Sequence, residues 1–252
     1  MGGGAQVPLV TVAVPSYNQG RYLNDALESI FAQDVPVEVY VADGGSTDNS
    51  LDVIRKWEAK LAGWRSGADA GQSAAINESV AKGSAPYVCW LNSDDWLLPG
   101  ALSKLVAALQ NKPAAPMAYG RAWNFVERTG RTSPVLVRPF SEWWMAQFCI
   151  VSQPATLIRR TAWEAVGGVD AKLHMAMDYD LWWRLYKTCG ALQFVDGFLA
   201  TNREHADTKT SKKRHQHYQE AMAVVRKHYG SVPLKWWLAQ PYAVWYRSLL
   251  GR

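Results

Sequence analysis

The sequence predicts an α/β fold in which helices flank a central, mostly parallel mixed sheet, with a helical extension at the C-terminus. Up to about residue 112, short apolar runs alternate with segments whose apolar side chains recur at helical spacing. Acidic turns follow several of the apolar runs, at the strand ends where parallel sheets bind their ligands. The 252 residues are 48% hydrophobic and 19% charged, a composition that supports a sizeable buried core.

Strands and helices alternate in the first part of the chain. Apolar runs bounded by turn residues predict strands at 9–15, 37–42 and 86–91. Apolar positions gathered on one helical face predict helices at 20–33, 51–61 and 71–82. Gly83 is expected to end the third helix, and Pro99 to open the next one, because a proline at the first helical position loses no hydrogen bond.

The rest of the chain has a weaker pattern. Residues 113–200 contain a tryptophan-rich stretch around Trp143 and Trp144. Helices are predicted at 161–166, 178–187 and 212–229, followed by an aromatic and basic segment at 234–250. Because the chain has no internal repeat and no low-complexity linker, we expect one domain, residues 1–210, and a basic, aromatic-rich helical extension, residues 211–252.

Positive charge is concentrated in the C-terminal tail. Residues 201–252 hold ten Lys and Arg against three Asp and Glu, whereas the net charge of the whole chain is +5. A basic tail on a neutral body favours an anionic partner, such as nucleic acid, an anionic membrane surface or a phosphorylated substrate. The tryptophans and tyrosines of the tail are typical of a membrane interface, and a helix packed on the body is the structural alternative.

Several classes of protein and site are disfavoured. The three cysteines lie forty or more residues apart without a CxxC pair, which argues against a zinc site and a disulfide framework and favours a reducing compartment. No secretory signal or membrane-spanning run is evident, so we expect a cytoplasmic protein, either in solution or peripheral on the cytoplasmic face of the inner membrane. Without GxGxxG, GxxxxGK[ST] or GxSxG motifs, a dinucleotide dehydrogenase, a P-loop NTPase or a serine hydrolase is not expected.

Two adjacent carboxylates, Asp94 and Asp95, follow the strand predicted at 86–91. Because adjacent carboxylates repel each other, their position at a strand end favours a hard cation such as Mg²⁺ or Mn²⁺. The structural alternative is a turn in which Asp95 caps the next helix. Spacing alone leaves both interpretations open.

Four further residues carry weaker signals. Asp43 ends a predicted strand, and it is either a turn residue or a hydrogen-bond acceptor for a base or ribose. Asp178 and Asp180 open a helix, where the dipole favours acidic residues; the alternative is a general base beside an aromatic sugar platform formed by the adjacent tryptophans. His205 is flanked by basic residues that suit a diphosphate, although a lone histidine is more often structural.

Five stretches of the sequence, taken together and in order, resemble the family 2 glycosyltransferases, which are inverting enzymes with a GT-A fold. They are VTVAVPSYNQGRYLNDALESIFAQ, VEVYVADGGSTDNS, DAGQSAAINESVAKGSAPYVCWLNSDDW, GGVDAKLHMAMDYDLWWRL and REHADTKT. The resemblance covers roughly residues 8–210. It implies that this part of the chain has the Rossmann-like GT-A fold.

The resemblance also implies roles for individual residues. Asp178 matches the catalytic base, and Asp94 and His205 match the ligands of a divalent cation, Mn²⁺ or Mg²⁺. Asp43 matches the residue that hydrogen-bonds a uracil-like base. The implied nucleotide- and donor-binding residues are Pro15, Ser16, Tyr17, Asn18, Asp43, Asp69, Gln72, Asn92, Ser93 and Lys209.

Two positions depart from the family pattern. Asn92 occupies the first position of the DxD-type motif, which removes one negative charge and is expected to weaken metal affinity. Met177 stands where many members of the family have a glutamate, so this neighbour cannot tune Asp178.

We therefore expect a metal-dependent inverting glycosyltransferase that moves a sugar from a nucleotide-sugar donor to a hydroxyl of a glycan acceptor. A UDP-sugar is the favoured donor. One base and one cation meet the needs of this reaction, whereas a glycoside hydrolase needs two facing carboxyl groups. If the tail binds a membrane, the expected acceptor is a polyprenol-diphosphate-linked glycan in bacterial surface polysaccharide, lipopolysaccharide or O-antigen assembly.

The competing functions are a non-catalytic carbohydrate-binding protein and a nucleotidyltransferase on a related fold. The tryptophans suit a carbohydrate-binding module, but this class does not explain the acidic strand ends. A nucleotidyltransferase usually has a glycine-rich basic loop after the first strand, and PSYNQGRYL matches this poorly. A nucleic-acid-binding protein explains only the basic tail, so no nucleic-acid partner is expected.

Overall fold

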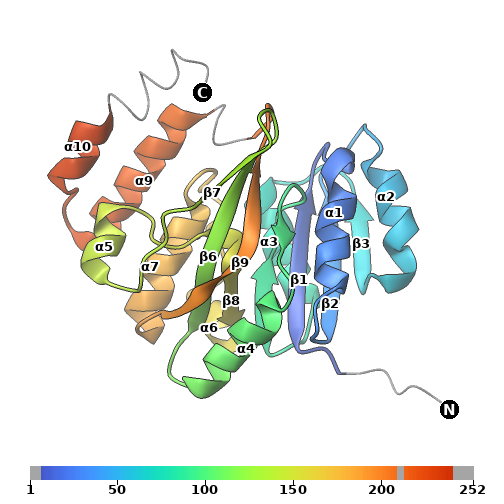
Figure 1. The fold of residues 1–252 in the computed structure, drawn as a ribbon, viewed down its shortest axis with the longest axis horizontal. Helices are drawn as coiled ribbons and strands as arrows, with labels where there is room; N and C mark the ends of the chain where they lie inside the picture. The colour runs from blue at the N-terminus through green and yellow to red at the C-terminus, as the bar shows by residue number, and fades with distance from the viewer. Residues whose placement is uncertain (1–6, 209–212, 241–252) are drawn as a thin grey trace.

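The computed structural model describes residues 7–208 and 213–240, and Figure 1 shows their arrangement. Within this part of the chain, nine strands form one sheet in the order β3-β2-β1-β4-β8-β6-β9-β5, with β7 paired to β6 outside this path. The strands are β1 (Val10–Ser16), β2 (Val37–Asp43), β3 (Gly63–Ser66), β4 (Tyr87–Trp90), β5 (Trp96–Leu97), β6 (Met117–Val126), β7 (Arg131–Pro134), β8 (Thr156–Arg159) and β9 (Gln193–Glu204). The helices are α1 (Gly20–Phe31), α2 (Ser50–Trp57), α3 (Gln72–Lys82), α4 (Ala101–Asn111), α5 (Glu142–Gln147), α6 (Arg160–Val166), α7 (Met177–Cys189), α9 (Arg214–Tyr229) and α10 (Leu234–Gln240), with 3-10 turns η1 (Glu58–Lys60) and η2 (Gln153–Ala155).

The sheet is mixed, as the sequence predicts. β1 is parallel to β2 and to β4, and β2 is parallel to β3, so the first part of the chain forms a parallel unit. β8 is antiparallel to both β4 and β6, and β5 is antiparallel to β9. Because β9 lies between β6 and β5 in the strand order, the last strand of the chain joins the middle of the sheet to its edge.

A hydrophobic core lies on each face of the sheet. Along β1, Val10, Val12 and Val14 belong to the core that includes α1 and α4, whereas Ala13 belongs to the core that includes α3 and α7. Successive side chains of a strand point to opposite faces, so one apolar run supplies both cores. This explains why the buried strands read as continuous apolar runs and not as alternating ones.

The predicted elements of the first part are confirmed, with two differences at helix ends. The helix predicted at 51–61 divides into α2 and the 3-10 turn η1. Pro99 does not open α4, because Gly100 adopts a left-handed backbone with a φ of 70° and α4 begins at Ala101. Gly167, also left-handed, ends α6 as the sequence predicts.

The segment between residues 113 and 200, which has little pattern in the sequence, contains four of the strands. β7 is exposed along its whole length, and β8 has only four residues. β6 and β9 pair with a register irregularity near Arg121. Short, edge-like or bulged strands of this kind leave a weak periodic signal, so sequence periodicity does not find them.

The described part of the basic tail packs on the body of the protein. Ala221, Met222, Val224 and Val225 of α9 are buried in the core that contains α7, and Trp236 of α10 joins them. This is the arrangement that the sequence analysis gave as the alternative to a membrane segment; residues 209–212 and 241–252 lie outside the description. None of the described helices is long and apolar enough to cross a bilayer. The division at residue 210 remains a prediction.

Candidate active site

The acidic turns singled out in the sequence meet at the carboxyl end of the parallel strands. Ser16 at the end of β1 pairs in register with Asp43 at the end of β2. β4 runs parallel on the other side of β1 and leads directly into the turn of residues 92–95. This edge of a parallel sheet is where α/β proteins bind ligands.

The two predicted metal ligands lie side by side. Oδ2 of Asp94 is 3.1 Å from Nε2 of His205, although the residues are 111 positions apart in sequence. The contact follows from the sheet, because Trp96 of β5 pairs with Thr201 of β9 and thereby brings both flanking turns together. The His205 side chain is almost fully buried, whereas that of Asp94 keeps 20% of its surface exposed.

Arg203 fastens the Asp94–Asp95 turn to β9. Its backbone N–H donates to Oδ1 of Asp95 at 3.0 Å, and its Nε donates to the carbonyl oxygen of Asp94 at 3.1 Å. The guanidinium lies between the rings of Tyr22 and Trp96, 4.7 and 4.8 Å from their centroids. The sequence analysis did not give Arg203 a role of its own, although it lies two residues before His205, on the same side of the strand.

Asp95 does not cap the following helix, which corrects the structural alternative proposed for it. Its carboxylate is buried and accepts hydrogen bonds from the backbone of Arg203 and from the side-chain amide of Asn92. Burial and the neighbouring charge of Asp94 raise the pKa of Asp95 well above its usual range. The turn therefore presents Asp94 outward and uses Asp95 to hold itself to the sheet.

Asn92 is the centre of a polar network in the same turn. Its side-chain oxygen accepts from Nε2 of Gln72 at 2.8 Å, and its amide nitrogen donates to Asp95 and to Oε1 of Gln153. Gln153 in turn donates to the carbonyl of Trp90 at 2.8 Å. The amide nitrogen of Asn92 thus donates two hydrogen bonds that an aspartate carboxylate at this position could not donate. These bonds are a structural reason for an asparagine at the first position of the motif.

Asp43 shapes a turn and has no exposed surface. Its carboxylate accepts from the backbone N–H groups of Gly45 and Ser46 and from the hydroxyls of Ser46 and Ser66. Three of these four donors lie in the turn after β2, and the fourth, Ser66, is the last residue of β3. In this structure the carboxylate therefore holds the turn to the end of β3, and its role as an acceptor for a base stays a prediction.

The residues after β1 form a second turn that packs against the first. Asn18 has a φ of 52°, unusual for a residue other than glycine, and its side-chain oxygen accepts the backbone N–H of Thr47 at 2.8 Å. Tyr17 is 62% exposed, whereas Pro15 and Ser16 are buried in β1. Of these predicted nucleotide-binding residues, Tyr17 and Asn18 are thus the ones that reach the surface.

Asp69 is held by a network of charges at the start of α3. Its carboxylate accepts from Arg65 at 3.0 Å and from the backbone of Gly71 at 2.8 Å. Arg65 also binds Glu78, and this ion pair and that with Lys82 lower the pKa of Glu78 to about 2. Arg65 donates to the carbonyl of Asp43 at 2.7 Å, so Asp69 is tied to the same sheet edge. Ser93 is buried within the turn of residues 92–95, and Lys209 lies outside the described residues.

Asp178, the predicted base, is half-buried in the first turn of α7. The preceding residue, Met177, contacts the hydroxyl of Ser73 on α3, directly after Gln72. The residue before Asp178 therefore contacts α3 next to Gln72, which belongs to the Asn92 network. Asp178 also lies close to Cys149, whose pKa is raised by burial and then by the Asp178 charge.

Asp180 and the adjacent tryptophans are structural, and the aromatic sugar platform is wrong. Trp182 and Trp183 have no exposed surface, so neither indole is available to a sugar. Asp180 is fully buried and accepts from Arg184, Lys227 and His228. Burial alone would raise the pKa of Asp180, but these three partners outweigh it and hold the pKa well below its usual range.

The described residues offer two ligands to a divalent cation, one carboxylate and one imidazole. No group of three or more His, Cys, Asp or Glu gathers in the part of the chain that the structure describes. Nδ1 of His205 accepts the N–H of Asp207 at 3.2 Å, so the neutral ring carries its proton on Nε2 and donates it to Asp94. The donor set fits a cation that takes most of its ligands from a diphosphate and water, provided that the Nε2 proton is displaced.

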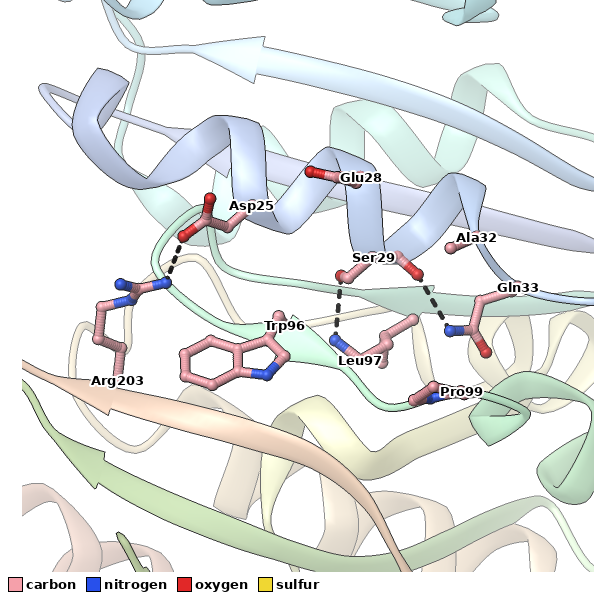
Figure 2. A pocket seen from close by; sticks show the side chains of 9 residues that line it. All are labelled: Asp25, Glu28, Ser29, Ala32, Gln33, Trp96, Leu97, Pro99 and Arg203. Carbon is pink, nitrogen blue, oxygen red and sulfur yellow. Dashed lines mark hydrogen bonds and ion pairs between the residues drawn. The ribbon is translucent and has the colours of Figure 1, made fainter. Parts of the chain in front are cut away.

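A separate cavity of 390 Å³ lies on the other side of Arg203, between α1 and β5 (Figure 2). Asp25 and Arg203 form an ion pair of 2.7 Å at one end, and Ser29 and Gln33 occupy the other end. Most of the polar groups that line it are engaged, since Ser29 accepts the N–H of Leu97 and Gln33 binds two backbone carbonyls. The cavity adjoins the Asp94 turn, because Arg203 lines the cavity and also donates to the carbonyl oxygen of Asp94.

The family model for glycosyl transferase family 2 matches residues 11–166 of this chain. The chain belongs to glycosyltransferase family 2. The match covers β1 to α6, including the turns of Asp43 and Asp94, and it confirms the family that the sequence motifs resemble.

Curated relatives of this family 2 chain include two synthases from Pasteurella multocida. It is 27% identical over 226 residues to a hyaluronan synthase and 26% identical over 234 residues to a chondroitin synthase. These alignments cover 82% and 83% of the chain but only 22% and 23% of the synthases, so the chain spans about a quarter of their length.

Solved structures share the fold at low sequence identity. The mannosyltransferase PcManGT from Pyrobaculum calidifontis, in complex with GDP-Man and Mn²⁺, has a TM-score of 0.69 at 19% identity and covers 94% of the chain and 72% of that protein. TarS 1-349 from S. aureus, in complex with UDP-GlcNAc, has a TM-score of 0.68 at 19% identity, with coverage of 87% and 66%. The family 2 chain therefore has the GT-A fold that the sequence predicts.

Proposed function

We propose that this chain is a metal-dependent inverting glycosyltransferase. Its donor is a nucleotide-sugar, with a UDP-sugar as the favoured candidate, and its acceptor is a glycan. The observation that carries the proposal is the 3.1 Å contact between Asp94 and His205 at the ligand-binding edge of the sheet. A carboxylate and an imidazole, buried on one side and open on the other, suit a divalent cation that also binds a nucleoside diphosphate.

In this proposal Asp94 and His205 hold Mn²⁺ or Mg²⁺. A divalent cation bound there neutralises the charge of the departing diphosphate. The residues of the neighbouring turns, Tyr17, Asn18 and Gln72, line the side on which the nucleotide and donor sugar bind. Arg203 and Asp95 keep the Asp94 turn in register with β9, so that the carboxylate stays beside His205.

Asp178 acts as the base in this proposal. It is half-buried, and the residue before it contacts α3 next to Gln72, which belongs to the Asn92 network. An inverting transfer needs one carboxylate to accept the proton of the acceptor hydroxyl as that oxygen attacks the anomeric carbon. Asp180 cannot serve, because its carboxylate is fully buried and bound to Arg184, Lys227 and His228.

Calorimetric titration tests the donor side. UDP, GDP and a deoxythymidine diphosphate are titrated into the chain with and without Mn²⁺, and into the D94N variant. We expect one nucleotide to bind the wild type in a metal-dependent manner and D94N to lose that dependence. If no nucleotide binds under either condition, the chain is not a nucleotide-sugar transferase, and a non-catalytic glycan binder becomes the better hypothesis.

Turnover measurements test the base. The D178A variant is expected to lose roughly 10²–10⁴-fold in turnover while donor affinity survives, as is usual for a positioned base. Turnover at the wild-type level in D178A would refute this assignment.

We also propose that the tail faces an anionic membrane and that the acceptor is lipid-linked, in bacterial surface polysaccharide or O-antigen assembly. α10 supports this, because Leu234, Trp237 and Leu238 are exposed while Trp236 of the same helix is buried. Lys235 lies beside them, and Trp143 of α5 is exposed as well. An apolar helix face with adjacent cations is typical of interfacial binding.

Liposome sedimentation tests the membrane hypothesis. The L234S/W237S/L238S variant is compared with wild type on vesicles of phosphatidylcholine alone and with phosphatidylglycerol added. We expect binding of the wild type to the anionic vesicles only, and loss of that binding in the variant. Equal sedimentation of both proteins would contradict a membrane role for α10.

A further inference from the structure

Three consecutive backbone N–H groups converge on one carboxylate oxygen just before α7. Oε2 of Glu220 accepts from His174 at 3.1 Å, from Met175 at 2.7 Å and from Ala176 at 3.1 Å. Glu220 belongs to α9, 44 positions after Ala176. Its other oxygen accepts from Gln216 at 3.0 Å. The tail helix thus supplies the acceptor for a loop that precedes Asp178 by two residues.

The carboxylate of Glu220 is charged in this arrangement. Burial would raise the pKa of Glu220, but the hydrogen bonds from Met175 and Ala176, Gln216 and His174 outweigh it and lower the pKa. Successive N–H groups that point at one position form a concave site for an anion. A charged acceptor binds such donors about twice as strongly as a neutral one, so charge is part of how Glu220 holds the loop.

α9 also contacts α7 directly after Asp178. Asp180 accepts from Lys227 at 2.9 Å and from His228 at 2.8 Å. Glu220 therefore holds the chain on one side of Asp178, and Asp180 is held on the other. Asp178 therefore lies between a main-chain segment that Glu220 holds and a side chain, that of Asp180, which Lys227 and His228 hold.

We propose that Glu220 is a positioning residue of the active site: its carboxylate fixes the loop of residues 174–176 and thereby the direction in which Asp178 points. The inference rests on the proposed role of Asp178 as the base. Since misplacement of a reacting group by about 1 Å can cost about 10²-fold in rate, a hold of this kind affects turnover without touching the substrate. The basic tail then has a catalytic purpose, whatever else it binds.

Two measurements on the full chain test the proposal, with E220Q as the variant and R226A as its matched control. E220Q keeps the shape of the side chain and removes its charge. R226A removes an exposed cation of α9 that contacts neither the loop of residues 174–176 nor Asp180. Melting temperatures of both variants show whether α9 stays docked.

The first measurement is hydrogen–deuterium exchange of the amides of residues 174–176. We expect exchange in E220Q to be faster by about 10-fold, the equivalent of 1.4 kcal/mol of lost protection, and exchange in R226A to match wild type. Unchanged exchange in E220Q, or equal acceleration in both variants, would overturn the proposal.

The second measurement is release of nucleoside diphosphate from UDP-GlcNAc and from GDP-mannose with water as the acceptor. We expect E220Q to lower kcat by about 10- to 10²-fold with the donor KM unchanged, and R226A to leave both constants unchanged. Wild-type kcat in E220Q, together with loss of turnover in D178N, would overturn the role of Glu220 and leave the base assignment intact. Full turnover in D178N would instead refute the proposed base. If the wild type turns over neither donor, the exchange measurement decides.

Discussion

The D180N substitution is expected to destabilise the protein strongly, although Asp180 takes no part in the proposed chemistry. The carboxylate has no exposed surface and accepts from two cations, Arg184 and Lys227, and from His228. Removing one partner of a buried ion pair generally costs 3–5 kcal/mol, because the remaining charges are left without compensation. For D180N we expect the free energy of unfolding to fall by about 3 kcal/mol, the lower end of that range, because two of the partners have an alternative. Lys227 is 55% exposed and can turn to solvent, and Arg184 keeps its bonds to the carbonyls of Val166 and Gly168.

Thermal unfolding checks this value. For a chain of this size, 1 kcal/mol shifts Tm by about 2–4 °C, so D180N should melt about 6–12 °C below the wild type. The control is K227A, which removes an exposed partner and should cost no more than about 1 kcal/mol. The reasoning is refuted if D180N melts within about 2 °C of the wild type, or if K227A costs as much as D180N.

Three further predictions concern the site, the acid stability and the core. R203K is expected to weaken metal-dependent nucleotide binding by about 10-fold, because lysine cannot reproduce the contacts by which Arg203 holds the Asp94 turn. Calorimetry in the presence of Mn²⁺ measures the affinity, and an unchanged affinity would argue that Arg203 does not hold this turn for binding. The pKa of Asp180 is lowered in the folded protein, so the carboxylate stabilises the fold fully above the ordinary pKa of an aspartate, and this stabilisation is lost as the pH falls toward the lowered pKa. Between about pH 5 and pH 3 the Tm of the wild type should therefore fall more than the Tm of D180N. Parallel curves of Tm against pH would contradict this. W182A should cost about 3–5 kcal/mol in urea unfolding, because the indole is fully buried against Trp90, and a small cost would indicate that the side chain is not part of the core.

The parallel unit of the fold could be predicted from the sequence because its signals are local. β1, β2 and β4 are short apolar runs and each helix has one apolar face, so these strands and helices follow from periodicity, whereas the short strands β3 and β5 were not predicted. The later strands escape this reasoning, since β7 is exposed along its whole length and β8 is only four residues long. Their positions depend on pairing with distant strands, which no local pattern encodes.

The candidate site divides in the same way. The pairing of Asp94 with His205 was implied by family motifs and not by spacing, because only the β5–β9 pair brings the two turns together. The supporting contacts of Arg203 and Gln153 were missed, since a single arginine or glutamine carries no signal until its partners are known. The resemblance assigned Asp43 to the nucleotide, and it gave no sign of the hydrogen bonds by which the carboxylate joins its own turn to the end of β3.

The position of β9 has a consequence for synthesis of the chain on the ribosome. His205 follows the last strand, and that strand lies between β6 and β5 in the sheet. A nascent polypeptide that ends before residue 193 has the whole family-matched segment but lacks both the strand and the imidazole that complete the pair with Asp94. If Asp94 and His205 hold a cation as proposed, premature termination products are expected to bind neither metal nor nucleotide, so incomplete chains would not compete for donor sugar with finished ones.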